Sequence, residues 1–385
     1  MISTSPETDL LVCVARRSLN DRFVARIQTL VERGLDWNRL FNEATNNGML
    51  PLLYRHLNAV CPESVPPEAL ERLRSEALTN TRLCLHLFSE LKRILTLFEQ
   101  NGLIAASFKG PVLSLAVYGD MALRPAGDLD ILVPPNEFRS ARDLLISAGY
   151  QMVSPLTESQ QDALLQSNCE LLFYADDGRL VDLHWGLSPR TFPFALDAQA
   201  VLRRREEFIN QGVSISTFSI EDTVLYLCFH GSKHYWSRLE WISSLAEFIR
   251  SNAAIDWPTV ISRAKTLHAG RILALGLLIA QDLEDVDLPE LTFLSSKDIE
   301  FMRKCAGEFE ARLFAGGTKW PTQMEMFSYN LKIMDRKRDA MVGLLRSAMV
   351  PTMSDWQVVN LPRPLHPLYY LLRPVRLIWK RRSAA

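Results

Sequence analysis

Apolar residues recur three and four positions apart over much of the first hundred residues, which is the spacing of one face of an α-helix. The clearest stretch is 83–98, where the recurring residues are Leu83, Leu87, Leu91, Ile94 and Phe98. A weaker pattern of the same period covers 10–24, and three prolines at 62–67 interrupt the region. The pattern therefore predicts an N-terminal helical region over residues 1–100.

Short apolar or alternating runs replace this spacing after residue 101. The runs typical of β-strands are 103–108, 128–133, 170–174, 180–185 and 213–218. The turn Ala175-Asp176-Asp177-Gly178 joins the third and fourth runs, which predicts an antiparallel hairpin. Helical spacing is found at 112–118 and 138–148, and it returns from 221 to about 349.

Together these elements predict an α/β (α+β) fold, in which a small mixed sheet of about four or five strands lies between N- and C-terminal helical regions. We expect four parts in chain order: a helical region over 1–100, a core with the sheet over 101–220, a helical domain closing a cleft over 221–349, and a basic, aromatic, proline-containing tail over 350–385.

The composition is that of a globular protein, with 48% apolar and 23% charged residues. The net charge of -1 gives no overall basic surface, so nucleic acid is not an expected partner. The six cysteines show no CxxC or zinc-finger spacing, as expected of reduced thiols in a cytoplasmic protein. The N-terminus lacks the pattern of a signal peptide, and the longest apolar run, 272–280, is far below the ~20 residues of a membrane span. We therefore expect a cytoplasmic protein without a transmembrane segment.

Two carboxylates at the start of the second predicted strand are the strongest sign of chemistry. Side chains at i and i+2 of a strand point to the same face, so Asp128 and Asp130 lie side by side. Two anions about 6–7 Å apart repel each other unless a cation lies between them. Mg²⁺ binds carboxylates together with substrate phosphates and suits this arrangement. The alternative is a solvated edge strand that carries two acids.

Two further features surround this acid pair. Strand 103–108 ends at Lys109 and Gly110 before a helix, an arrangement that offers backbone N–H groups and a positive helix end to a phosphate. On the later hairpin, Asp182 adds a third carboxylate. A strand, a glycine turn, a helix, an acid pair and a third acid form the layout of a two-metal nucleotidyl-transfer site, where cations about 3.5–4 Å apart hold the attacking and leaving oxygens.

These motifs together resemble the uncharacterised nucleotidyltransferase family of the polymerase-beta-like superfamily. The segments that carry the resemblance are Lys109-Gly110, Tyr118-Gly119-Asp120, Arg124, 128–133 and 181–185, with 230–241 similar to a second characteristic block. The resemblance covers roughly residues 80–250 and implies a nucleotidyltransferase-type sheet. It implies that Asp128 and Asp130 would ligate both metal ions, while Asp182 would hold the catalytic ion and help to deprotonate the acceptor hydroxyl. The cofactor would be two Mg²⁺ ions, with Mn²⁺ as the alternative.

The activity implied by the resemblance is metal-dependent transfer of a nucleoside monophosphate from an NTP, such as ATP, to a hydroxyl of an unknown acceptor, with release of pyrophosphate. Gly110 would let the backbone approach the triphosphate. The superfamily usually has Ser after this glycine, whereas Pro111 offers neither a hydroxyl nor an N–H. Lys109 or Arg124 would then supply the missing phosphate contact, or Lys109 is a structural ion-pair partner. The alternative function is a catalytically inactive nucleotide-binding or partner-binding regulatory module.

The block that begins at residue 230 allows three interpretations. His230 and His234 share a helix face, so they form a zinc pair, a histidine face packed against the sheet, or part of a basic, aromatic wall that binds the nucleotide or the acceptor. The residues of this wall would be His230, Lys233, His234, Trp236 and Arg238. On the strand face of Asp182, His184 orients that carboxylate, acts as an auxiliary base, or only packs.

The C-terminal tail is strongly basic. Residues 361–385 contain no acid and six basic residues: Arg363, Arg373, Arg376, Lys380, Arg381 and Arg382. Because aromatic and aliphatic residues are interleaved with them, the tail is able to make peripheral contact with an anionic membrane surface. Its four prolines, at 362, 364, 367 and 374, argue against one long helix. The alternative is a tail that wraps its own domain or is solvated.

Overall fold

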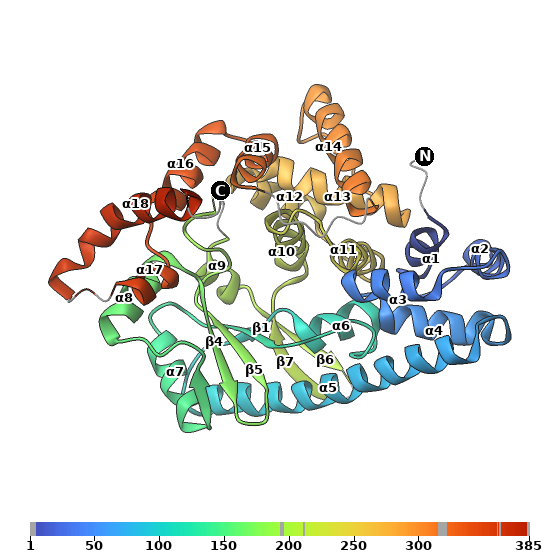
Figure 1. Ribbon diagram of the computed structural model, residues 1–385, viewed down its shortest axis with the longest axis horizontal. Coiled ribbons are helices and arrows are strands. Elements are labelled where there is room, and N and C mark those ends of the chain that lie inside the picture. Colours follow the sequence, from blue (N-terminus) through green and yellow to red (C-terminus); the bar gives the residue numbers. More distant parts are fainter. Residues whose placement is uncertain are drawn as a thin grey trace.

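The computed structural model describes residues 5–192, 196–210, 212–314, 322–359, 361 and 363–382. Helices surround a mixed sheet of five strands, and a second sheet of two strands lies beside it (Figure 1). The predicted α+β class is therefore confirmed. All six cysteines lie in the described part of the chain, where they are buried and form no disulfide.

The N-terminal region is helical, as predicted. Its elements are α1 (Pro6–Val14), α2 (Asp21–Glu32), α3 (Trp37–Asn46), α4 (Leu50–Val60), the short 3-10 helix η1 (Pro62–Ser64) and α5 (Pro67–Gln100). The weak pattern at 10–24 belongs to two helices, because the Asn20 side chain caps α2 by accepting a hydrogen bond from the Phe23 N–H. Pro67 stands in the first turn of α5, where a missing N–H costs nothing.

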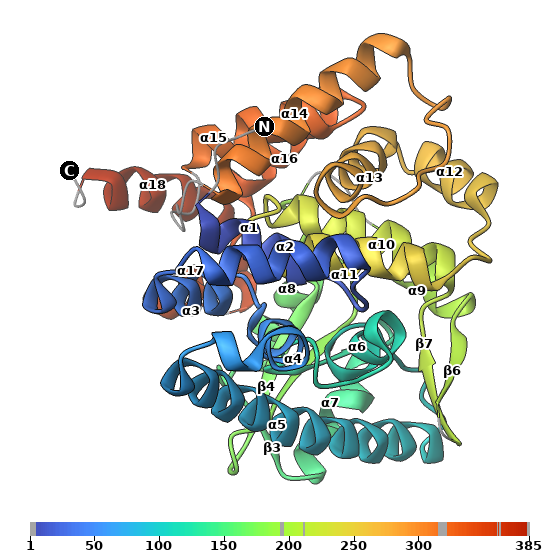
Figure 2. The ribbon, with the colours of Figure 1, turned by 90° about the vertical axis from the view of Figure 1, so that its right-hand side faces the viewer.

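Helix α5 supports one face of the sheet. Its apolar stripe (Leu87, Leu91, Ile94 and Phe98) is buried in one core cluster with residues of the sheet, among them Leu129 and Val181. Figure 2 shows the other helices in tiers over α5, with α4 next to it and α1, α2 and α11 beyond. The helical spacing read from the sequence thus identifies the face that packs on the sheet.

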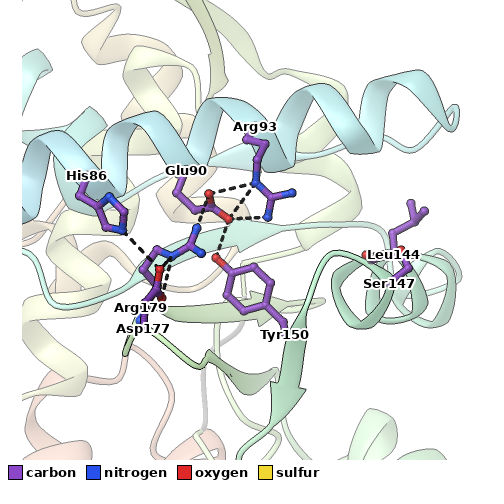
Figure 3. A network of polar contacts seen from close by, with 8 residues as sticks. All are labelled: His86, Glu90, Arg93, Leu144, Ser147, Tyr150, Asp177 and Arg179. Carbon is purple, nitrogen blue, oxygen red and sulfur yellow. Dashed lines mark hydrogen bonds and ion pairs between the residues drawn. The ribbon is translucent and has the colours of Figure 1, made fainter.

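A polar network also ties α5 to the sheet (Figure 3). The Glu90 carboxylate accepts a hydrogen bond from the hydroxyl of Tyr150, at 2.7 Å, and forms ion pairs with Arg93 and Arg179. Arg179 in turn pairs with Asp177. Burial alone would raise the pKa of Glu90, but these donors outweigh it and lower the pKa, so the group is a carboxylate at neutral pH.

The main sheet has the strand order β1-β2-β5-β4-β3. Its strands are β1 (Ala106–Ser107), β2 (Leu129–Leu132), β3 (Tyr150–Met152), β4 (Glu170–Ala175) and β5 (Leu180–His184). All pairs are antiparallel except β2 and β5, which run parallel. Predicted strand 103–108 is reduced to two residues, and β3 was not predicted. The run 213–218 is β7 (Val213–Thr217), which pairs with the unpredicted β6 (Glu206–Asn210) in the separate two-stranded sheet.

Helices fill the connections and the C-terminal half. Those between the strands are α6 (Gly110–Tyr118), α7 (Phe138–Ser147), α8 (Glu158–Ser167) and α9 (Ala198–Arg203). The later ones are α10 (Ile220–Lys233), α11 (Leu239–Ser251), α12 (Trp257–Thr266), α13 (Gly270–Glu284), α14 (Ser296–Phe314), α15 (Gln323–Ile333), α16 (Lys337–Met349), α17 (Met353–Val358), η2 (Arg363–Leu368) and α18 (Tyr369–Arg382). Within the described residues, none of these helices combines the length and the apolar character needed to cross a membrane.

The tail is not one long helix, as its prolines predicted, but it is more ordered than they suggested. Helix α18 continues through Pro374, and its Arg373 and Arg376 form ion pairs with Asp355 of α17. Part of the tail therefore packs on its own chain. Pro362 and the side chains of Arg363, Lys380, Arg381 and Arg382 lie outside the described residues.

Candidate active site

A cavity of about 550 Å³ lies where the N-terminal helices, the sheet and the C-terminal helices meet. Several residues singled out from the sequence line it: Lys109, Gly110, Arg124, Asp128, Asp130, His230, His234 and Arg238. These residues come from the turn before α6, the loop before β2, and α10 with the segment after it. A cavity of this size accommodates a small-molecule ligand.

Parallel pairing of β2 and β5 brings two of the three predicted acids together. Asp130 and Asp182 are register partners in neighbouring strands. One ligand atom from each of Asp130, Asp182 and His184 lies within 4.8 Å of the others. Asp182 and His184, which follow Asp130 by 52 and 54 positions in the chain, thus form one cluster with it because β5 lies beside β2.

Asp130 is the most buried acid of the cluster and has close contacts with two basic side chains. Its Oδ1 accepts a hydrogen bond from Lys109 Nζ at 2.7 Å, and His184 Nε2 lies 3.0 Å from the same oxygen. Burial alone would raise the pKa of Asp130, but the charges of Lys109 and His184 outweigh it and hold the pKa well below its usual range. Asp130 is therefore ionised and already paired with cations of the protein.

The Lys109 side chain is largely buried, and its main partner is the Asp130 carboxylate. Burial alone would lower the pKa of Lys109, but Asp130 and Tyr226 outweigh it and raise the pKa, so the side chain carries a positive charge. Lys109 is thus an ion-pair partner of Asp130, one of the two roles expected from the sequence. Because the residue also lines the cavity, its charge remains within reach of a ligand there.

Gly110 opens helix α6 at the edge of the cavity. Its φ of +60° lies in the left-handed region that favours glycine, and a Cβ at this position would lie 3.3 Å from the backbone oxygen of Asp128. Both observations explain the glycine at this turn. Pro111 fits the first turn of α6 without loss of a helical hydrogen bond.

Asp182 differs from Asp130 in lacking a close cationic partner. Its Oδ1 is buried and has no hydrogen-bond partner among the described residues, and its Oδ2 lies 3.7 Å from His184 Nε2. Burial, followed by the charges of Glu170 and Asp130, raises the pKa of Asp182 to about 7. This carboxyl is therefore short of positive charge. Half-buried Asp128 shares this property, since burial and Asp130 raise its pKa as well.

The hard oxygen donors of this cluster fit a divalent cation. Asp130 and Asp182 converge on one point, and the unpartnered Oδ1 of Asp182 is an oxygen that a cation would satisfy. A bound cation would also lower the pKa values of Asp128 and Asp182, which burial and the neighbouring carboxylates raise.

Glu170 also belongs to this cluster, although the sequence analysis did not identify it as a site residue. It is the register partner of His184 on β4, and its Oε2 lies 3.3 Å from His184 Nδ1. Burial alone would lower the pKa of His184, but Asp130, Asp182 and Glu170 outweigh it and raise the pKa. The signal was present, because a hairpin that turns at 175–178 puts residue 170 opposite residue 184.

Arg124 is held by a residue that the sequence analysis did not identify. Its guanidinium lies 2.7 Å from Glu240 Oε1, and Arg238 lies 3.4 Å from the other carboxylate oxygen. Glu240 is buried and lines the cavity with both arginines. Each arginine thus reaches the cavity from a fixed position, with one carboxylate shared between them.

His230 and His234 line the cavity but are not cationic. Burial lowers the pKa of His230 well below its usual range, and it lowers the pKa of His234 to about 3. The expected cationic character of these two histidines is therefore wrong at neutral pH. Both rings contact Trp241, at 5.4 and 5.2 Å between centroids, so this side of the cavity is a neutral, aromatic wall.

Two residues of the predicted wall lie away from this cavity. Trp236 is buried, with its ring packed over Gly231 and Gly276, so it is a core residue. Lys233 lines a second cavity of about 330 Å³, and His234 lines both cavities. Lys233 forms no hydrogen bond or ion pair with the residues that the structure describes.

The family of this protein follows from comparison with known proteins. A family model described as "Uncharacterised nucleotidyltransferase" matches residues 33–284. A crystal structure of an antigenic nucleotidyltransferase-like protein from Paracoccidioides brasiliensis is similar at 14% sequence identity, with a TM-score of 0.26, over 49% of this chain and 87% of that chain. No curated protein matches the chain. Because the family model spans more than half of its residues, the protein belongs to the uncharacterised nucleotidyltransferase family.

Proposed function

We propose that the protein is a metal-dependent nucleotidyltransferase, which moves a nucleoside monophosphate from an NTP to a hydroxyl of an acceptor and releases pyrophosphate. The observation that carries the proposal is the convergence of Asp130 and Asp182 from neighbouring parallel strands beside a cavity. Family membership supports a transferase. We expect it to act in the cytoplasm, with ATP among its candidate nucleotides.

The metal ligands of this proposal are Asp128, Asp130 and Asp182. Mg²⁺ suits their oxygen donors, and Mn²⁺ is the alternative ion. When bound, divalent ions supply positive charge to the phosphates and to the attacking and leaving oxygens. Lys109 and His184 both contact Asp130, so groups of the chain itself help to keep this carboxylate ionised.

The NTP occupies the larger cavity. Gly110 allows the phosphates to approach the backbone at the start of α6, and Lys109, Arg124 and Arg238 provide positive charge at the cavity wall. The neutral rings of His230 and His234 give an apolar, aromatic surface on which a base can stack.

The acceptor occupies the second cavity, which Lys233 and His234 line together with Phe192, Tyr235 and Leu344. Its proximity to the first cavity through His234 supports this assignment, because the acceptor has to meet the nucleotide. Its hydroxyl oxygen attacks the α-phosphorus, a new P–O bond forms, and the bond to the pyrophosphate oxygen breaks. The hydroxyl proton passes to the carboxylate of Asp182, which lies 3.7 Å from His184 Nε2, and Glu170 contacts the other ring nitrogen of His184.

Single substitutions at the two converging acids test the proposal. With α-labelled NTPs, Mg²⁺ and cell extract as the source of acceptor, Asp130→Asn and Asp182→Asn should each reduce labelling by at least about a thousandfold. A matched control is Asp176→Asn, in the exposed turn between β4 and β5, which should label like the wild type. Circular dichroism establishes that all three variants are folded. Wild-type labelling by either active-site variant would refute the proposal.

The inactive nucleotide-binding module remains the second candidate. The observations in its favour are Pro111 in place of the usual serine and the Lys109 ammonium on Asp130. Calorimetry with NTP and Mg²⁺, together with a pyrophosphate-release assay, separates the two functions. Tight binding by the wild type without pyrophosphate release in any extract would support the module.

A further inference from the structure

Helix α18 carries an apolar stripe on its solvent side. Its exposed apolar residues, three or four positions apart, are Leu371, Leu372, Val375 and Trp379, and Leu368 at the end of η2 continues the spacing. Val375 is 65% exposed and Trp379 is 74% exposed. Such spacing defines one face of a helix, and in a globular protein that face usually packs against the core.

The opposite face of α18 fixes this orientation. Tyr369 is buried, and its hydroxyl donates a hydrogen bond of 2.6 Å to the Val359 carbonyl. Arg373 pairs with Asp355 at 2.7 Å and donates to the Ser347 carbonyl of α16. Two anchoring residues, one helical turn apart, therefore hold the polar and aromatic face inward. The apolar stripe is left outside.

Helix α16 repeats the arrangement beside α18, and Figure 1 shows the two helices at the same corner of the molecule. Met341, Leu345 and Met349 are four positions apart and exposed, with Leu345 at 63%. Ala340, on the other side of the helix, is buried. We call the exposed side chains of these two stripes the α16–α18 surface. Exposed apolar side chains gathered on two neighbouring helices are typical of interaction sites.

The charge around this surface indicates the kind of partner. Residues 332–382 contain eleven Lys or Arg and three Asp, a net charge of +8, whereas the whole chain carries -1. Apolar side chains with a tryptophan, among many basic residues, are the features of helices that lie in the interface of an anionic membrane. A second copy of the chain would bring an equal positive charge to the same place, which opposes self-association.

We propose that the α16–α18 surface binds peripherally to anionic phospholipid membranes, with its apolar stripes inserted among the acyl chains and the exposed basic residues 336–338, at the start of α16, near the headgroups. Each basic residue near such a surface contributes about 1 kcal/mol, an attraction that salt weakens. The proposal does not depend on nucleotidyl transfer, so it can fail while the proposed function holds.

Vesicle flotation of the full-length protein tests the proposal. Vesicles of phosphatidylcholine with about 30% phosphatidylglycerol should bind the protein, whereas pure phosphatidylcholine should bind it at least about tenfold more weakly. The double variant Leu371→Asp with Val375→Asp should lose at least about tenfold in affinity, because two apolar side chains no longer insert. A second pair on α16, Met341→Asp with Leu345→Asp, should act in the same direction.

The matched control is Leu85→Asp with Ile209→Asp, two exposed apolar residues on α5 and β6. This control should bind vesicles like the wild type, and thermal unfolding shows that each variant is folded. Equal binding to both vesicle types, binding unaffected by both surface variants, or no vesicle binding at all would overturn the proposal. Self-association is the other possible outcome. It would be indicated if the protein bound no vesicles and light scattering showed a dimer that the surface variants convert to monomers.

Discussion

The ammonium nitrogen of Lys109 lies 2.7 Å from Oδ1 of Asp130, whose side chain is buried, while that of Lys109 is 19% exposed. A lysine of the chain therefore neutralises the carboxylate that, in the proposed function, binds metal. Any ion that binds Asp130 has to share the carboxylate with Lys109 or displace the lysine ammonium group.

Replacement of this lysine should be partly compensated by metal. Lys109→Met leaves the buried Asp130 carboxylate with His184 alone, and we expect a loss of at least about 2 kcal/mol in the free energy of unfolding. Addition of Mg²⁺ should raise the Tm of Lys109→Met more than that of the wild type, because the ion supplies the missing charge. Thermal unfolding with and without Mg²⁺ measures both effects.

The control for this prediction is Lys92→Met, since Lys92 is exposed on α5. It should change neither the Tm nor its response to Mg²⁺. An equal response of Lys109→Met and the wild type to Mg²⁺ would count against a cation site at Asp130.

Gly110→Ala should affect both stability and activity. The left-handed φ of +60° costs about 1 kcal/mol for alanine, and the added Cβ meets the Asp128 carbonyl at 3.3 Å. Gly149→Ala is a matched control, because Gly149 also has a positive φ but nothing within 4 Å of its Cβ position. Both variants should be less stable by about 1 kcal/mol in urea unfolding, but only Gly110→Ala should also lose nucleotide binding by calorimetry. Equal nucleotide binding by the two variants would contradict a phosphate site at the turn.

Tyr150→Phe tests the network in Figure 3. The lost hydroxyl donates to the buried, ionised Glu90, so we expect a loss of about 1.5–3 kcal/mol in the free energy of unfolding. Tyr174→Phe is the control on the neighbouring strand, where the hydroxyl donates to Gln151 in an exposed hydrogen bond. It should cost about 0.5 kcal/mol or less. Similar losses in both variants, measured by urea unfolding, would mean that the Glu90 network adds no stability.

Glu310 should make stability depend on pH. Burial, followed by the charge of Asp282, raises the pKa of Glu310 to about 7, and its Oε1 is buried without a partner among the described residues. The folded protein therefore keeps a proton that the unfolded chain releases above pH ~4.5, so this group destabilises the fold progressively as pH rises from ~4.5 to ~7.

Glu310→Gln removes that dependence. At pH 8 the variant should be more stable than the wild type by about 1–2 kcal/mol, which is less than the full shift implies because the side chain is only half-buried. At pH 4 the two proteins should be equally stable. Urea unfolding at both values checks the prediction, and the same difference at pH 4 and pH 8 would show that titration of Glu310 is not its cause.

Local patterns in the sequence were sufficient for most of the framework. The stripe from Leu87 to Phe98 identified the buried face of α5, because helical spacing depends only on near neighbours. The same holds for the hairpin of β4 and β5, because four consecutive residues, 175–178, form its turn. The pairing of Asp130 with Asp182 has a local signal too, because each acid belongs to a short run typical of a strand, although the parallel register that joins the two runs does not.

Features that depend on distant residues could not be predicted. Strand β1 keeps two residues and β3 three, so neither has enough length for a periodic signal. The ion pairs of Arg124 with Glu240 and of Lys109 with Asp130 join segments that only the folded chain brings together. The neutral state of His230 and His234 follows from burial by neighbouring helices, which their spacing does not reveal.

The parallel pairing of β2 with β5 has a consequence for the protein during its synthesis. Asp130 leaves the ribosome well before Asp182, and α7, β3, α8 and β4 separate the two in the chain. A parallel neighbour can dock only after the connecting segment has been made. A nascent chain that ends before β5 thus carries an unfinished acid cluster, and premature termination yields fragments in which Asp130 lacks its neighbouring carboxylate, Asp182.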